Sequence, residues 1–504
     1  MCYIKKQLHI LPRGQLLLEV EMLFNSYEFI FLFLPIAILG FFGIARWSHR
    51  AATAWLVVAS LFFYGWWDWH YVPLLMSSIV WNYFIGCRLE RQPGRRGWLI
   101  LGITVNLALL GYFKYTDFFL GTVNALAGAD VFSLPHIVLP LGISFFTFTQ
   151  TAYIIDAYRG ETVGDSFLTY CEFVTIFPHL IAGPIINHKD MMPQFTAERT
   201  FRLDYSNLSM GLTLFAMGLF KKVVIADWLS PIVGDVFTHA DSVSLIEAWI
   251  GALGYTLQLY FDFSGYSEMA IGLGLMLNLR FPVNFDSPYR STSIIEFWRR
   301  WHMTLGSWVK YYLYIPLGGN RHGEWKKMRN LFVSMLIIGL WHGAGWTFIL
   351  WGALHGVALM INHQWRRLQL AMPKTLAWTL TFLVVMVCWV FFRAENFHVA
   401  IAILSAMTDI HNLALPAGTS LEHHLGFLQA YGITFIGYCI KQQFHQCLIV
   451  IGILLMAVLF APNPIRLAER HFQTNWRWLI ASSALILYAI YKMNTYTEFL
   501  YFQF

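Results

Sequence analysis

Long apolar runs separated by short polar segments repeat along the 504 residues of this chain. A helix needs about 20 apolar residues to cross ~30 Å of hydrocarbon. By this length rule we expect about 11 to 13 membrane elements, which predicts an all-α polytopic membrane protein. The runs that support this prediction are 27–45, 52–64, 71–85, 137–157, 170–186, 208–219, 248–263, 269–277, 331–361, 376–392, 425–440, 447–461 and 476–491.

Two of these regions contain residues that interrupt a helix. Pro178, Gly183 and Pro184 break the run 170–186, which predicts a re-entrant element. Irregular backbone at membrane depth is tolerated only inside protein or beside a water-filled cavity. Polar residues within FDFSGYSE, among them Asp262 and Glu268, separate two further runs and predict a second break.

The distribution of basic residues suggests an orientation. The segment 88–96, RLERQPGRR, predicts a cytoplasmic loop, whereas 116–136 contains no Lys or Arg and is expected outside. Residues 1–21 are interpreted as an N-terminal extension, either disordered or untranslated, because Met22 is a natural start. Residues 22–504 then form one transmembrane domain.

Composition agrees with a membrane setting. Hydrophobic residues make up 57% of the chain, charged residues only 12%, and the mean hydropathy is +0.54. The net charge of +6 fits basic cytoplasmic loops better than a nucleic-acid surface, because the Lys and Arg residues lie between apolar runs, and membrane lipids are an expected partner. The six cysteines are scattered and form no CxxC pair, so neither a disulfide framework nor a metal site is predicted.

A basic, aromatic segment precedes the longest apolar run. Trp298, Trp301, Leu305, Trp308 and Tyr312 follow at three- and four-residue steps, which predicts one interfacial helix on which Glu296 can pair with Arg299 or Arg300. The aromatic residues either anchor this helix at the headgroups, or the segment also binds a phosphorylated donor such as acyl-CoA. The predicted substrate-binding residues are Arg299, Arg300, Lys310, Arg321, Trp298 and Trp341, and Lys326 and Lys327 are further candidates for the phosphates.

The run 331–361 contains His342, with Gly339, Gly343 and Gly345 around it. A titratable side chain within a membrane segment is a functional-site hypothesis by default. A neutral imidazole there could act as a general base toward a hydroxyl, or it could simply hydrogen-bond between helices. His355 lies about 220° around an ideal straight helix from His342, so the two would not share a face. For His355 and His363 the structural interpretation is favoured.

Several motifs resemble the membrane-bound O-acyltransferase family, and in particular the bacterial branch of the alginate O-acetylases and the membrane protein of peptidoglycan O-acetylation. The matching stretches lie between Met22 and Phe504. They include LPLGISFFTFTQTAYIIDAYRGE, FPHLIAGPIINHKDMMPQF, FDFSGYSEMAIGLGLMLNLRFPVNFDSPYRSTSIIEFWRRWHMTLGSWV, YLYIPLGGNRHG, LWHGAGWTFILWGALHG, VFFRAENF and EFLYFQF.

The resemblance implies specific roles. His342 matches the essential catalytic His of the family, and His302, forty residues earlier, matches its second motif residue. It further implies helices enclosing a tunnel, with the acyl donor entering from the cytoplasm. Lys310 and Tyr311 stand where the branch usually has Arg-Asp, so no role is carried over to that Asp.

These observations together predict a multi-pass acyltransferase of the bacterial inner membrane. It would move acetyl groups, with acetyl-CoA as donor and no permanently bound cofactor, toward an extracytoplasmic polysaccharide such as alginate. The resemblance also implies a periplasmic partner with a serine-esterase-like fold. Asp262, Glu268 and Glu296 are expected to be structural acids. Peptidoglycan O-acetylation, D-alanyl-type transfer, a polytopic transporter and a structural scaffold of a secretion complex are the alternatives.

Overall fold

The computed structural model describes residues 22–162, 164–416, 424, 426–431, 433–436, 444–493 and 500. The predicted extension 1–21 lies outside the described residues. Helices dominate the described chain, and its two strands are three residues long, which agrees with the all-α prediction.

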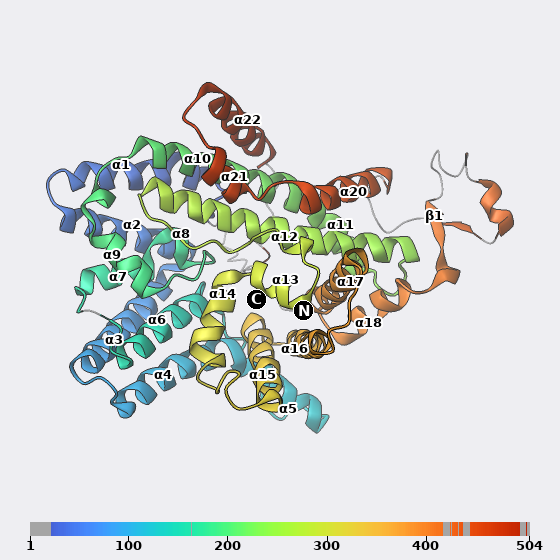
Figure 1. The fold of residues 1–504 in the computed structure, drawn as a ribbon, viewed down its shortest axis with the longest axis horizontal. Coiled ribbons are helices and arrows are strands. Elements are labelled where there is room, and N and C mark those ends of the chain that lie inside the picture. Colours follow the sequence, from blue (N-terminus) through green and yellow to red (C-terminus); the bar gives the residue numbers. More distant parts are fainter. Residues whose placement is uncertain are drawn as a thin grey trace, which may run out of the picture.

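The N-terminal half forms a layered group of helices, drawn from blue to green in Figure 1. Its elements are η1 (Phe29–Phe33), α1 (Leu34–Ala45), α2 (His49–Asp68), η2 (Trp69–Tyr71), α3 (Val72–Arg91), α4 (Arg96–Leu110), η3 (Gly111–Tyr115), α5 (Thr116–Ala127), α6 (Ile143–Tyr158), α7 (Phe167–Thr175), α8 (Phe177–Leu180), α9 (His188–Thr196), η4 (Glu198–Phe201), α10 (Tyr205–Phe220), η5 (Lys221–Ala226) and α11 (Asp227–Thr238).

The C-terminal half begins with the longest helix, α12 (Leu245–Met276), which crosses the molecule in Figure 1. The elements that follow are η6 (Pro288–Arg290), α13 (Ile294–Arg300), α14 (Met303–Val309), η7 (Lys310–Tyr314), α15 (Glu324–His342), α16 (Trp346–Arg367), α17 (Lys374–Arg393), α18 (Phe397–Ala406), η8 (Ile410–Asn412), β1 (Ala414–Pro416), η9 (Gly426–Tyr431), β2 (Thr434–Ile436), α20 (Phe444–Phe460), α21 (Pro464–His471) and α22 (Trp476–Lys492). The strands pair in parallel, with Ala414 opposite Thr434.

Helix α12 is continuous, so the break predicted at FDFSGYSE is wrong. Two buried ion pairs explain how its carboxylates are tolerated. The carboxylate of Glu268 accepts a hydrogen bond from the Lys221 ammonium group at 2.5 Å. The carboxylate of Asp262 accepts one from the Lys222 ammonium group at 2.8 Å. Both lysines belong to the π-helix η5, which continues α10. The acids are therefore structural, as predicted, because each neutralises a buried cation.

Helices α10 and α12 approach each other closely at glycines. A Cβ on Gly218 would lie 2.4 Å from the carbonyl oxygen of Gly265, and one on Gly211 would lie 2.5 Å from that of Gly272. Any larger side chain would push the helices apart and separate the lysines of η5 from their carboxylates. The glycines thus set the helix spacing that the ion pairs require.

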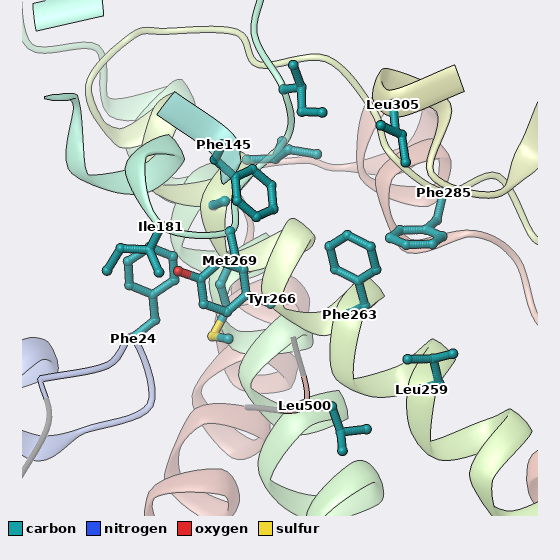
Figure 2. Close-up of a cluster of buried hydrophobic side chains, with 14 of the residues drawn as sticks. Phe24, Phe145, Ile181, Leu259, Phe263, Tyr266, Met269, Phe285, Leu305 and Leu500 are labelled. Carbon is teal, nitrogen blue, oxygen red and sulfur yellow. The ribbon is translucent and has the colours of Figure 1, made fainter. Parts of the chain in front are cut away.

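A cluster of large apolar side chains fills the space beside α12. Figure 2 shows Phe263, Phe285 and Leu305 gathered on one side, and Tyr266, Met269 and Phe24 on the other. Leu500, near the C-terminal end, joins this cluster and donates its N–H to Asp262 at 3.1 Å. Segments far apart in the sequence therefore converge on the middle of α12.

The predicted interruption of the run 170–186 is confirmed. Helix α7 ends at Thr175, α8 covers only Phe177–Leu180, and the chain then stays irregular and buried to Ile186. His179 supports this irregular segment, since its Nδ1 lies 2.8 Å from the carbonyl oxygen of Pro184.

Four described helical segments are long and apolar enough to cross a membrane. The bent pair α20 and α21, which turns by 50°, makes a fifth if it counts as one span. The four are His49–Arg91, Arg96–Ala127, Tyr205–Thr238 and Lys374–Arg393. A polytopic helical fold is thus present, whereas the larger predicted count of 11 to 13 elements and the predicted loop orientations stay predictions.

Candidate active site

The two histidines singled out by the family resemblance meet in the structure. The ring centroids of His302 and His342 lie 6.4 Å apart, although forty residues separate them in the chain. Both side chains are buried. His302 immediately precedes α14, and His342 is the last residue of α15.

The prediction of a single interfacial helix around His302 is wrong, because the helix is interrupted at Trp301 and His302. Trp301 is extended, and His302 has the left-handed values φ 43° and ψ 54°. A non-glycine residue rarely adopts this conformation, and such strain concentrates at functional sites. The segment holding Asn284 and Asp286 stabilises the break: Met303 donates its N–H to the Asn284 carbonyl, and Asp286 donates its N–H to the Arg300 carbonyl, both at 2.9 Å.

Asn284 determines the proton position of a neutral His302. Its Oδ1 accepts from the Thr304 N–H at 3.3 Å and from the Thr304 hydroxyl at 3.0 Å. The backbone donor identifies this atom as the amide oxygen. His302 Nδ1 lies 3.0 Å from the same oxygen, so Nδ1 must donate and Nε2 carries the lone pair. In this tautomer Nε2 of His302 can accept a proton or a hydrogen bond.

Lys114 and Tyr115 of η3 hold the end of the helix that presents His342. The Tyr115 hydroxyl donates to the Leu340 carbonyl at 2.9 Å. The Lys114 ammonium group donates to the Trp341 carbonyl, to the His342 carbonyl at 3.3 Å and to the Ser144 hydroxyl at 3.2 Å. Terminal carbonyls lack partners within a helix and carry its negative dipole end, so a buried cation fits this position.

Aromatic rings enclose the imidazole of His342. The ring centroids of Trp341, Trp351 and Phe392 lie 5.0, 5.2 and 5.3 Å from it. These rings place the imidazole in surroundings of low polarity, where electrostatic interactions are strong.

The turn at Gly343 to Gly345 separates α15 from α16, so the run 331–361 is two helices and not one straight helix. The turn brings His342 and His355 against the same side chain, Trp351. The ring centroids of His355 and Trp351 lie 4.9 Å apart. The indole N–H of Trp298 donates to His355 Nδ1 at 3.3 Å. This hydrogen bond between α13 and α16 confirms the structural interpretation of His355.

The residues predicted to bind the donor are scattered. Arg300 pairs with Glu296 at 2.9 Å, whereas Arg299 forms no such pair and is exposed. Lys310 and Arg321 are also exposed, in η7 and in the following turn. Trp341 is buried and stacks on Phe148 with centroids 5.0 Å apart. Of the predicted set, Trp341 lies beside His342, Trp298 contacts His355, and Arg300 lines a polar cavity.

Residue-by-residue inspection of the sequence missed Lys114 and Asn284. Lys114 carried a usable signal, because it is a lone cation in the apolar stretch GYFKY. Asn284 carried none, since an asparagine in a polar loop is common. Among the described residues, no three His, Cys, Asp or Glu side chains gather as metal ligands.

Comparisons with known proteins agree with this geometry. The family model "MBOAT, membrane-bound O-acyltransferase family" matches residues 161–401, which include both histidines. The chain is 47% identical over 428 residues to the peptidoglycan O-acetyltransferase of Helicobacter pylori, covering 78% of this chain and 81% of the relative.

Two other relatives widen the comparison. A probable alginate O-acetylase AlgI of Pseudomonas aeruginosa is 47% identical over 398 residues, covering 77% of this chain and 75% of the relative. The teichoic acid D-alanyltransferase of Bacillus subtilis is 26% identical over 394 residues, covering 73% and 95%. These matches favour the enzyme over the transporter and the scaffold. The chain belongs to the membrane-bound O-acyltransferase family and is an O-acyltransferase of a polytopic membrane fold.

Proposed function

We propose that this protein transfers acetyl groups across the bacterial inner membrane, from acetyl-CoA to hydroxyl groups of an extracytoplasmic polysaccharide. The observation that carries the proposal is the juxtaposition of His302 and His342, 6.4 Å apart in a buried aromatic setting. Relatives whose names specify alginate and peptidoglycan O-acetylation, at 45–48% identity, support the acetyl group and the glycan.

In the proposed reaction His342 is the general base. It takes the proton from the attacking hydroxyl as the new ester C–O bond forms at the acetyl carbonyl, and the thioester C–S bond breaks. The proton then passes to the departing CoA thiolate, which leaves as the thiol. His302, with its lone pair on Nε2, orients the hydroxyl by accepting its hydrogen bond. Lys114 holds the end of α15 and thereby keeps His342 in place.

The acceptor hydroxyl belongs either to the glycan or to the serine of a periplasmic esterase-like partner that completes the transfer. The low-polarity surroundings of His342 suit a step from which water is excluded. An alginate-like glycan and peptidoglycan are both compatible with the relatives. D-Alanyl transfer is the weaker candidate, because two relatives named for it are only 28% and 26% identical.

The test is ester-linked acetate on purified envelope polysaccharides from cells that express the wild type, His342→Ala or no protein, at matched membrane levels. We expect acetate on one glycan to be lost equally in the mutant and in the absence of the protein, since the general base is removed. His363→Ala, a change in a histidine outside this site, serves as the control and should retain acetate. Wild-type acetate in His342→Ala would overturn the assignment.

A further inference from the structure

A polar cavity is lined by Asp286 and Arg300, which are close in the chain to Asn284 and His302. Its volume is about 200 Å³. Its lining is rich in basic side chains from three regions of the chain: Arg290 of η6, Arg300 of α13, and Arg466, Arg470 and His471 of α21. Asp286 is the one acidic residue that lines it.

The positive charge of this cavity is only partly neutralised. The Asp286 carboxylate accepts a hydrogen bond from the Arg466 guanidinium group at 2.5 Å. It also lies 3.5 Å from the guanidinium group of Arg300, which pairs with Glu296 as well. Arg290 donates to the backbone carbonyls of Val458 and Ala461. Four guanidinium groups thus line the cavity together with one carboxylate, Asp286, and only Arg300 has a second carboxylate partner, Glu296.

Arg470 is the arginine available to a ligand. Among the described residues it forms neither a hydrogen bond nor an ion pair, and it is exposed at the cavity rim. A concave site with surplus charge of one sign concentrates ligands of the opposite sign. Guanidinium groups in particular match the geometry of phosphate oxygens and bind them bidentately.

The cavity is connected to the catalytic histidines by a short piece of paired backbone. The backbone N–H of Asp286 donates a hydrogen bond to the Arg300 carbonyl. Two residues earlier, the carbonyl of Asn284 accepts from the Met303 N–H, and its side-chain oxygen contacts the ring of His302. In extended chain two residues span about 7 Å. A ligand whose phosphate occupies the cavity would therefore lie beside the segment that holds His302 in its left-handed conformation.

We propose that this cavity binds a phosphate group. Two sources offer that chemistry: the nucleotide end of a CoA-type donor, which rests on the proposed function, and the headgroup of an anionic phospholipid. Arg470 and Arg466 contact the phosphate, while Arg300 and Asp286 hold the cavity wall. Arg300 is thus the one predicted donor-binding residue that lines this cavity, and the two arginines of α21 were not predicted from the sequence.

The first arm measures binding of CoA to the full chain in nanodiscs of phosphatidylcholine, by calorimetry and without turnover. The variants are Arg470→Gln and the double variant Arg466→Gln/Arg470→Gln. Arg477→Gln is the matched control, because Arg477 lies at the start of α22 and outside the cavity. We expect the loss of each of these two arginines to raise the dissociation constant for CoA by about tenfold, which corresponds to ~1.4 kcal/mol.

The second arm measures retention of phosphatidylglycerol by native mass spectrometry for the same variants. If CoA affinity is unaffected but the double variant loses phosphatidylglycerol relative to Arg477→Gln, the phosphate site stands and its ligand is lipid. If CoA affinity falls, the ligand is the donor. If neither ligand distinguishes the cavity variants from the control, the proposal is wrong.

These arms separate the cavity from the proposed function. His342→Ala removes the general base but leaves the four arginines in place, so it should bind CoA like the wild type. If His342→Ala retained glycan acetate while Arg470→Gln still weakened CoA binding, only the assignment of His342 would fail. If CoA binding and lipid retention were equal in all variants, the cavity would not be a phosphate site, whatever the acetate measurement shows.

Discussion

Three lysines are buried in the part of the helical core that the structure describes, and their partners differ. Lys221 and Lys222 of η5 face carboxylates of α11 and α12: Glu268 at 2.5 Å, Asp262 at 2.8 Å and Asp227 at 2.8 Å. Lys114 of η3 donates instead to the Trp341 and His342 carbonyls and to the Ser144 hydroxyl. Among the described residues it pairs with no carboxylate.

This difference separates a structural charge from one that serves the site. A buried ion pair compensates two charges within the protein, so it serves the packing of the helices. A buried lysine amine held by carbonyls and a hydroxyl has no carboxylate to compensate its charge, and here it lies at the end of α15, beside His342. Removing one or the other should therefore damage different properties of the molecule.

The largest expected effect is loss of folding in Lys222→Met. This change leaves Asp262 and Asp227 buried without their shared cation, which should destabilise the protein by about 3–5 kcal/mol. Thermal unfolding of the detergent-purified protein measures the effect. A triple variant that adds Asp262→Asn and Asp227→Asn should recover part of the loss. A wild-type unfolding temperature in Lys222→Met would refute the structural assignment.

Lys114→Met should damage activity more than stability. No buried carboxylate is left unpaired, so the cost is that of unsatisfied polar groups, about 1–3 kcal/mol. Acyl transfer should fall by about 100-fold, since misplacing a reacting group by 1 Å has that effect. Glycan-linked acetate and unfolding temperature are measured on the same preparations. If Lys222→Met and Lys114→Met changed stability and activity alike, the distinction between a structural lysine and a lysine of the site would be refuted.

Asn284→Ala tests the orientation of the second histidine. Without Oδ1, His302 Nδ1 loses the acceptor that holds its proton there, and acyl transfer should fall by about 100-fold, the low end of what a positioned acid or base contributes. Nitrogen NMR of labelled imidazole should report a mixture of tautomers in place of one. Thr304→Ser keeps the hydroxyl and is the control. An unchanged tautomer in Asn284→Ala would contradict the role.

The smallest effect concerns Glu296, on the short helix α13. Burial raises the pKa of its carboxyl, but hydrogen bonds from the Thr292 N–H and the Arg300 guanidinium outweigh it, so the pKa lies below its ordinary value. Its contribution is present at neutral pH and lost as the pH falls through the lowered pKa. Glu296→Gln should cost about 0.5–1 kcal/mol at pH 7, as half-exposed pairs do. The difference from wild type should shrink in acid.

Sequence patterns anticipated the helical class because apolar runs long enough to cross a bilayer leave the backbone few alternatives to a helix. They also anticipated the broken run around Pro178 and the structural role of Asp262 and Glu268. They failed where a local pattern was outweighed by distant contacts. The helical stripe from Trp298 to Tyr312 is interrupted at His302, because bonds from Asn284 stabilise a conformation that spacing does not predict.

Hydropathy and motif identity are local properties, so the sequence alone indicates that this chain is a helical membrane protein and that His302 and His342 belong to its site. Three features come from the packing of the helices: the two rings lie 6.4 Å apart, Lys114 holds the end of α15, and Asn284 fixes a tautomer. The physical reason is separation along the chain. Each of these contacts joins residues brought together by helix packing, and side-chain spacing within one segment carries no information about it.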